Sequence, residues 1–224
     1  MTTLMRMARP ARPRALAGPL RLPLASALGT PAKVALLRLV TAGGEAISQR
    51  EAARRAGIQV RSAQRALDDL VALGLVTRLV GGREHLVHLN GAHRLAAALA
   101  AVFAQEADHF LALRQALHGV ATRARPRPLS LVLFGSAARG DDVLASDVDV
   151  LAVGRNPAEA GVLLERLIAA GATLRAAFGA EVRPVTLTRL ELRRQWPSRG
   201  SLARRAAEDG LLIYGTALYE LGRS

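Results

Sequence analysis

The sequence predicts an α+β protein of two domains: a helical N-terminal module with a β-hairpin, a long connecting helix, and a C-terminal α/β module with a small mixed sheet. Helical periodicity before residue 92, alternation of strand-like and helical segments after residue 128, and an uneven division of charge all support this fold class. The 224 residues suffice for two small domains. The predicted segments are a tail (1–25), the helical module (26–92), the connecting helix with its following loop (93–128) and the α/β module (129–224).

Composition excludes several classes of protein. Hydrophobic residues make up 50% of the chain, enough for a sizeable core, and the absence of cysteine excludes a disulfide scaffold, a cysteine-ligated zinc site and a cysteine nucleophile. The longest uncharged apolar run, Leu95 to Gln105, has eleven residues, whereas a membrane span needs about 20. We therefore expect a soluble, cytoplasmic protein with no membrane partner.

Positive charge is concentrated in the N-terminal part. The formal net charge is +13, yet residues 129–224 carry twelve basic and eleven acidic side chains, so the excess lies before them. This distribution predicts a polyanionic partner for the N-terminal half. Residues 1–25 contain five arginines, four prolines and no acid, which is typical of a disordered tail. An additional contact of this tail with the polyanion is the alternative.

Three helices and a hairpin are predicted in the N-terminal module. Pro31 suits a first helical position, and Ser48 with Glu51 three residues later has the pattern of a capping box. The predicted elements are a helix from Pro31 to Gly43, a helix from Ser48 to about Ala56, a helix over Val60–Leu73 ended by Gly74, and strands over Leu75–Val80 and His85–Leu89.

The third helix has the composition of a helix that reads DNA. Its apolar face is accounted for by Ala63, Ala66, Leu67 and Leu70, and the opposite face carries side chains that hydrogen-bond to base edges and phosphates: Gln59, Arg61, Ser62, Gln64 and Arg65. Arg50, Arg54 and Arg55 on the preceding helix are placed to contact the DNA backbone. Arg78 and Arg83 on the hairpin are expected to contact the minor groove or a phosphate.

This stretch resembles the winged helix-turn-helix transcriptional regulators of bacteria. The resemblance covers Ser48 to Arg78, SQREAARRAGIQVRSAQRALDDLVALGLVTR. It implies that DNA is a partner of this module. A winged helix used for protein contacts is the alternative, which the arginines on the exposed face disfavour.

Residues 93–123 are predicted to form one long amphipathic helix, because apolar residues recur at steps of three and four. Pro126 and Pro128 follow its end. Two interpretations remain open. The helix packs on its neighbours as a connection, or its near-heptad spacing forms the seam of a homodimer.

The C-terminal module alternates strands and helices. Predicted strands cover Leu131–Phe134, Val148–Val153, Val182–Leu187 and Leu211–Tyr214, and predicted helices cover Pro157–Ala177, Arg189–Gln195 and Ser201–Asp209. Pro184 cannot donate a backbone hydrogen bond, so the third strand should lie at a sheet edge or contain a bulge.

Residues suited to phosphate and metal chemistry lie at the end of the first of these strands and at the beginning of the second. Gly135 and Ser136 come directly after the first strand, where glycine permits close approach of a phosphate to backbone amides. Asp147 and Asp149 are two residues apart on a strand, so both carboxylates project from one face and suit Mg²⁺. Arg139 is placed to pair with phosphate oxygens.

Together these residues resemble the nucleotidyltransferase superfamily of DNA polymerase β, and most closely its minimal nucleotidyltransferases. The family pattern is Gly-Ser, about ten residues, then Asp-x-Asp in a strand, and the stretch LFGSAARGDDVLASDVDVLAV matches it. The resemblance implies that Asp147 and Asp149 are catalytic and hold two Mg²⁺ on a nucleoside triphosphate. Gly135, Ser136 and Arg139 would bind the nucleotide, and a nucleotidyl (adenylyl) group would pass to a protein or nucleic-acid hydroxyl.

The sequence departs from the family at a third carboxylate that members usually supply from a later strand. Arg183 occupies the position that aligns with it, and Glu181, two residues earlier, is the candidate catalytic substitute. Otherwise the site binds nucleotide without effective turnover. The alternative function is then a transcriptional regulator that senses nucleotide, or an antitoxin, because minimal nucleotidyltransferases often pair with a small helical toxin.

Overall fold

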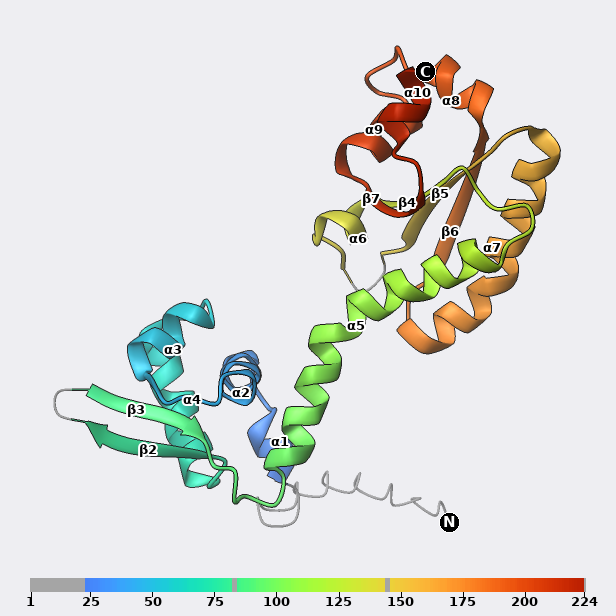
Figure 1. The fold of residues 1–224 in the computed structure, drawn as a ribbon. Helices are drawn as coiled ribbons and strands as arrows, with labels where there is room; N and C mark the ends of the chain where they lie inside the picture. Colours follow the sequence, from blue (N-terminus) through green and yellow to red (C-terminus); the bar gives the residue numbers. More distant parts are fainter. Residues whose placement is uncertain (1–22, 82–83, 144–145, 224) are drawn as a thin grey trace, which may run out of the picture. The chain divides into compact units, whose positions relative to one another are not determined.

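A computed structural model describes residues 23–81, 84–143 and 146–223 (Figure 1). The chain divides into two compact units, Met1–Glu106 and Ala107–Ser224, and the division falls inside the long helix α5 (Ala96–Arg123). The expected disorder of residues 1–22 and the expected DNA contact of Arg83 lie outside the described residues.

The first unit has the predicted arrangement of helices followed by a hairpin. Its elements before α5 are α1 (Pro23–Ala27), α2 (Pro31–Ala42), β1 (Ile47–Ser48), α3 (Gln49–Arg55), α4 (Val60–Ala72), β2 (Val76–Gly81) and β3 (Glu84–Leu89). The three strands form an antiparallel sheet in the order β1-β3-β2. The sequence analysis did not predict β1, because two residues are too few to show a strand pattern.

The helix α1 begins inside the segment that the sequence analysis assigned to the tail. Proline is compatible with the first turn of a helix, where its missing N–H has no intrahelical partner. Pro23 therefore opens α1, and Ala27 at its end is fully buried against the core of the first unit.

Ser48 caps α3 as predicted: its side chain accepts a hydrogen bond from the Glu51 N–H at 3.3 Å. The predicted return contact of the capping box, from the Glu51 side chain to the Ser48 backbone, is wrong. The Glu51 carboxylate accepts hydrogen bonds from Arg54 and Arg55 at 2.6 to 2.8 Å instead of turning back to Ser48. Two guanidinium groups within one helical turn attract the carboxylate more strongly than a single amide does.

These contacts predict an acid-dependent loss of stability. Hydrogen bonds from Arg54 and then Arg55 lower the pKa of Glu51 from 4.5 to about 2. A depressed carboxyl pKa stabilises the folded state above the unfolded-state pKa, so this contribution is present above pH 4.5 and is lost as the pH falls toward 2. We expect the melting temperature of Glu51→Gln to fall less steeply than that of the wild type as the pH is lowered below 4.5. If the melting temperatures of both proteins fell equally with pH, these ion pairs would add nothing to stability.

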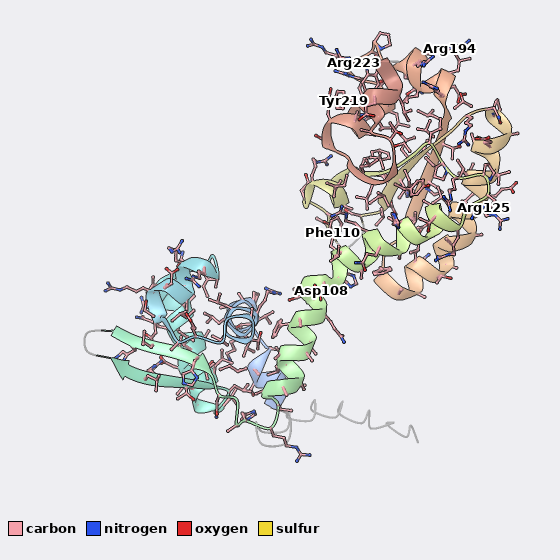
Figure 2. The ribbon with its side chains drawn as sticks, viewed as in Figure 1. Asp108, Phe110, Arg125, Arg194, Tyr219 and Arg223 are labelled. Carbon is pink, nitrogen blue, oxygen red and sulfur yellow. The ribbon has the colours of Figure 1, made fainter. Side chains whose placement is uncertain are left out.

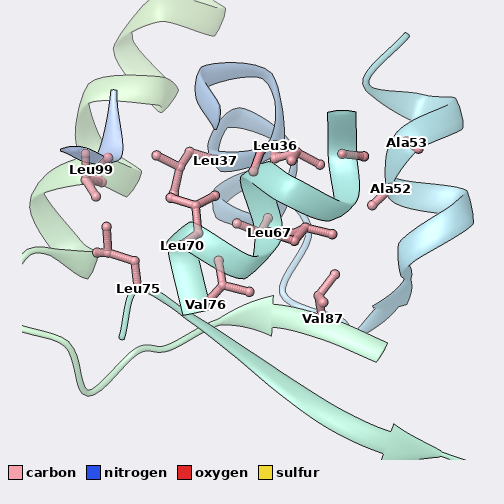
Figure 3. Close-up of a cluster of buried hydrophobic side chains, with 14 of the residues drawn as sticks. Leu36, Leu37, Ala52, Ala53, Leu67, Leu70, Leu75, Val76, Val87 and Leu99 are labelled. Carbon is pink, nitrogen blue, oxygen red and sulfur yellow. The ribbon is translucent and has the colours of Figure 1, made fainter. Parts of the chain in front are cut away.

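The core of the first unit lies between the helices and the hairpin (Figure 3). Its fully buried side chains include Leu36 and Leu37 of α2, Leu67 and Leu70 of α4, and Val87 of β3. Leu99 from α5 packs against the same cluster. Burying each leucine contributes about 1.5 to 3 kcal/mol, so this core fixes which face of α4 remains exposed.

The second unit is a four-stranded mixed sheet with helices on both faces (Figure 1). Its elements after α5 are β4 (Ser130–Phe134), α6 (Ser136–Arg139), β5 (Val148–Gly154), α7 (Pro157–Phe178), β6 (Val182–Thr188), α8 (Arg189–Gln195), α9 (Leu202–Asp209), β7 (Leu211–Gly215) and α10 (Leu218–Arg223). The strand order is β6-β5-β4-β7, with β5 and β6 parallel and the other pairs antiparallel. Pro184 therefore lies on an edge strand, as predicted.

Alternate residues of β5 point to opposite faces of the sheet. Val148, Val150 and Ala152 join the core formed with α5 and α7. Leu151 and Val153 join the core formed with α8, α9 and α10. The alternation places Asp149, two residues before Leu151, on the α8–α10 face at the beginning of β5.

Helix α5 supplies Leu99 and Phe103 to the first core and Leu113 and Leu117 to the second. Among the described residues, α5 is the single helix that is long and apolar enough to cross a membrane, by length and composition alone. Core helices of soluble proteins share this composition. Part of the apolar surface of α5 is buried against the two cores. Between these contacts Asp108 and Phe110 are exposed (Figure 2).

Candidate functional site

Helix α4 separates cleanly into a buried and an exposed face. Ala63, Ala66, Leu67 and Leu70 are buried in the core. The five residues predicted to contact DNA, which are Gln59, Arg61, Ser62, Gln64 and Arg65, are all exposed. The structure therefore brings together on one face the whole set that sequence reasoning assigned to this helix.

Two arginines on this exposed face keep their charge available for a partner. The carboxylates further along α4 are occupied, because Asp68 pairs with Arg78 at 2.5 Å and Asp69 pairs with Lys33 at 2.7 Å. Within the described residues, neither Arg61 nor Arg65 forms an ion pair. An exposed, unneutralised pair of guanidinium groups suits phosphate oxygens and base edges.

Other arginines of the first unit are held by intramolecular contacts. Arg54 and Arg55 both bind Glu51, and Arg78 binds Asp68. When the Gln49 amide is oriented with its oxygen toward Arg78, that oxygen accepts from Nε at 2.8 Å and from Nη2 at 3.1 Å. Arg78 thus connects the hairpin to α3 and α4, which is a positioning role in addition to the predicted DNA contact.

The two aspartates of the predicted site, Asp147 and Asp149, lie at the beginning of the inner strand β5. Asp149 pairs in register with Phe134 of β4, so the chain turns at Gly135 directly beside the Asp149 side chain. Gly135 has φ 79° and ψ −157°, a conformation that is essentially restricted to glycine. A Cβ at this position would lie 2.6 Å from Asp149 Oδ2. The structure therefore brings the glycine bend and one aspartate into contact.

Arg183 lies on the neighbouring strand and faces the same site. In the parallel pair of β5 and β6, Arg183 is in register with Asp149. Its Nε atom is 3.0 Å from Asp147 Oδ2, and the side chains of Asp147 and Arg183 are 23% and 66% exposed. The register places Arg183 beside Asp149, so a positive charge lies next to the aspartate pair.

Burial is the main influence on the electrostatics of Asp149. Burial raises the pKa of Asp149, and the negative charge of Asp147 raises it further, whereas the positive charge of Arg183 lowers it. A partly buried carboxylate next to a second carboxylate stores unfavourable energy that a bound cation relieves. A positively charged ligand would therefore stabilise the charged form of Asp149.

Comparison with known families assigns both units. Residues 30–83 match the MarR family, and residues 113–212 match the nucleotidyltransferase domain. The chain joins a MarR-family winged-helix domain to a nucleotidyltransferase domain. No curated protein and no solved structure gave a significant match to the chain. The nucleotidyltransferase match includes the glycine bend, both aspartates and Arg183.

Within the nucleotidyltransferase domain, two of the predicted site residues are held by other side chains. Arg139 Nε is 3.2 Å from Asp141 Oδ2, and its Nη1 is 3.5 Å from Asp209 Oδ2. Glu181 is 3.6 Å from Arg175 Nη1, and its side chain is 60% exposed. Ser136 is the first residue of the short helix α6, next to Gly135.

The donor set of the nucleotidyltransferase domain fits one divalent cation. Asp147 and Asp149 supply the carboxylate oxygens that Mg²⁺ prefers. Among the described residues, no group of three or more acidic, histidine or cysteine side chains gathers as a metal site. Arg183 contributes a positive charge beside Asp147, which disfavours a second cation on that carboxylate.

Sequence reasoning missed the partners that hold these charged side chains. Asp209 fixes Arg139, Arg175 fixes Glu181, and Asp68 with Gln49 fixes Arg78. No spacing rule connects these positions, because each pair is made by tertiary packing. The Arg139–Asp209 contact, for example, joins α6 to the last residue of α9, far away in the sequence.

Proposed function

We propose that this protein is a DNA-binding regulator whose nucleotidyltransferase domain binds a magnesium-bound nucleoside triphosphate. The observation that carries the proposal is the exposed face of α4, where Arg61 and Arg65 have no intramolecular ion pair within the described residues. DNA and nucleoside triphosphates are both cytoplasmic ligands in bacteria, so we place the protein in the cytoplasm.

The chemistry of the α4 face favours DNA over a protein partner. Arginine hydrogen-bonds to guanine, glutamine to adenine and serine to either base. The face contains each of these residue types and, from Gln59 to Arg65, no exposed carboxylate to repel phosphate. An interface for protein contacts would instead be expected to expose several aromatic or large apolar side chains at its centre, whereas Val60 is the exposed large apolar side chain among residues 59–65.

Salt dependence tests the DNA-binding proposal. We expect the purified protein to bind duplex DNA at low salt, with an affinity that falls linearly on logarithmic axes as salt rises, because lysine and arginine contacts release counterions. Fluorescence anisotropy with labelled duplexes over a range of salt concentrations measures this slope. Absence of binding at low salt would contradict the proposal.

Nucleotide binding is supported by the contact between Gly135 and Asp149. A cation held by the two aspartates would lie beside the glycine bend, so a triphosphate bridged by that cation could reach the Gly135 and Ser136 amides. The Arg139 side chain is 44% exposed, so it could exchange its carboxylate partners for a phosphate.

A second candidate function is transfer of the nucleotidyl group. The aspartate pair beside the glycine bend favours it, since that is the arrangement in which a cation and a triphosphate meet. In this reaction an acceptor hydroxyl forms a bond to the α-phosphorus, the bond to the β-phosphate oxygen breaks, pyrophosphate leaves, and the hydroxyl proton passes to solvent. The acceptor would be a protein or nucleic-acid hydroxyl.

Calorimetry and labelling separate binding from transfer. We expect the wild type to bind ATP or GTP in the presence of Mg²⁺, and Asp149→Asn to lose most of this affinity, because the amide lacks the negative charge with which a carboxylate binds Mg²⁺. Nucleotide binding without incorporation of α-labelled nucleotide would support sensing. Incorporation that Asp149→Asn abolishes would support transfer, and equal binding by both proteins would contradict the assignment of the site.

A further inference from the structure

We propose that Arg183 replaces one of the two cations that a site of this kind would hold, so that the domain binds a single divalent cation through Asp149 and Asp147. This inference rests on the proposed nucleotide site. It assigns Arg183 the role of a built-in positive charge, which makes the site suited to retaining a nucleotide rather than to transferring it.

The first support is the contact that Arg183 makes. Its Nε atom is 3.0 Å from Asp147 Oδ2, which is a hydrogen-bonding distance for a charged donor and acceptor. A second cation bound to this oxygen would have to displace the guanidinium group or lie next to it. Two positive centres in contact with one carboxylate oxygen repel each other, so the arginine and a second ion are alternatives.

The second support is that the backbone directs Arg183 toward the site. Arg183 is aligned with Asp149 across the parallel strands β5 and β6. Paired residues in neighbouring parallel strands project to the same face of the sheet. The side chain can change rotamer, because it is 66% exposed, but its Cα cannot move away without breaking the sheet. A positive charge at this position is therefore part of the fold.

The third support is that no other described acid takes the place of the missing carboxylate. Glu181, the candidate from the sequence, is 3.6 Å from Arg175, and its side chain is 60% exposed. Two further acids near the bend, Asp141 and Asp209, both contact Arg139, and no group of three metal-ligating side chains gathers among the described residues. Asp149 lies against the Gly135 backbone and remains as the principal ligand of one ion.

A single cation has a consequence for function. In two-metal sites the pair of ions stabilises both the attacking and the leaving oxygen of an in-line displacement. One ion together with Arg183 can neutralise a bound triphosphate, because a guanidinium group binds phosphate well. An arginine cannot activate a hydroxyl as a metal does, so binding of the nucleotide is retained and its transfer is slow.

Manganese binding measured by electron paramagnetic resonance tests the proposal on the full-length chain. Four proteins are compared: the wild type, Arg183→Gln, Arg183→Glu and the control Arg194→Glu. The control makes the same change of charge on α8, which follows the opposite end of β6 from Arg183. With Mn²⁺ alone, we expect the affinity of Arg183→Gln to rise about tenfold over the wild type, the low end of the effect of a neighbouring charge. Arg183→Glu should bind more tightly still, and Arg194→Glu should match the wild type.

Ion stoichiometry gives the second measurement. With a non-hydrolysable triphosphate analogue present, we expect one Mn²⁺ per chain in the wild type and two in Arg183→Glu. Two ions in the wild type, or an affinity of both Arg183 variants equal to that of Arg194→Glu, would overturn the proposal. If Arg183→Glu does not fold, Arg183→Gln still tests the effect of the charge. A gain in Mn²⁺ affinity in a protein that ignores nucleotide would uphold the role of Arg183 and refute nucleotide binding.

Discussion

Replacing Gly135 with alanine is expected to abolish nucleotide binding by the second unit and to lower its stability. The backbone of Gly135 has φ 79° and ψ −157°, and an alanine in so restricted a region costs about 1 to 3 kcal/mol. The added Cβ would also lie 2.6 Å from Asp149 Oδ2, closer than such atoms can approach, so the carboxylate or the bend must move. Either movement separates the proposed cation ligand from the amides that would meet the triphosphate. Calorimetric titration with nucleotide and Mg²⁺, together with chemical denaturation, measures both effects.

Gly140→Ala is the matched control for this change. Gly140 also has a positive φ, 77°, but nothing lies within 4 Å of a Cβ built there. We expect this variant to lose about 1 kcal/mol of stability from its left-handed backbone and to keep its nucleotide affinity. If Gly140→Ala reduced nucleotide affinity as much as Gly135→Ala does, the loss would reflect general destabilisation rather than the contact with Asp149.

The elements that the sequence predicted well are those whose signal is local. The amphipathic pattern of α4 identified both its buried and its exposed face, since helical periodicity depends only on neighbouring residues. Pro184 indicated an edge strand because it lacks one backbone donor. The same locality applies to Asp147 and Asp149, whose spacing of two residues places both carboxylates on one face of β5 whatever the rest of the fold is.

The features that could not be predicted depend on tertiary pairing. The contact between Gly135 and Asp149 exists because β4 and β5 are antiparallel with Phe134 opposite Asp149, a register that no local pattern specifies. The partners of arginine side chains are harder still to predict, because each long side chain can reach several acidic residues. The expected partner of Arg139 was a phosphate, whereas folding places Asp141 and Asp209 beside it.

Removing both unpaired guanidinium groups from α4 is expected to weaken DNA binding by about 100-fold or more, because each good contact to a base edge contributes about 1 to 3 kcal/mol. The double variant is Arg61→Gln with Arg65→Gln. Both side chains are exposed, so the helix should fold normally, and glutamine keeps the helical propensity. Fluorescence anisotropy at several salt concentrations measures the slope of log affinity against log salt concentration. If both lost contacts were to phosphates, the magnitude of this slope should fall by about two.

The control for net charge is the double variant Arg194→Gln with Arg223→Gln, which removes two exposed arginines from α8 and α10 (Figure 2). A change in total charge alone would weaken DNA binding equally in both double variants. A local interface on the MarR-family domain would be weakened strongly by the α4 pair and little by the control pair, since Arg194 and Arg223 belong to the second unit and lie outside that domain. Equal losses would therefore assign DNA affinity to the overall charge of +13 and would remove the argument for α4 as the recognition helix.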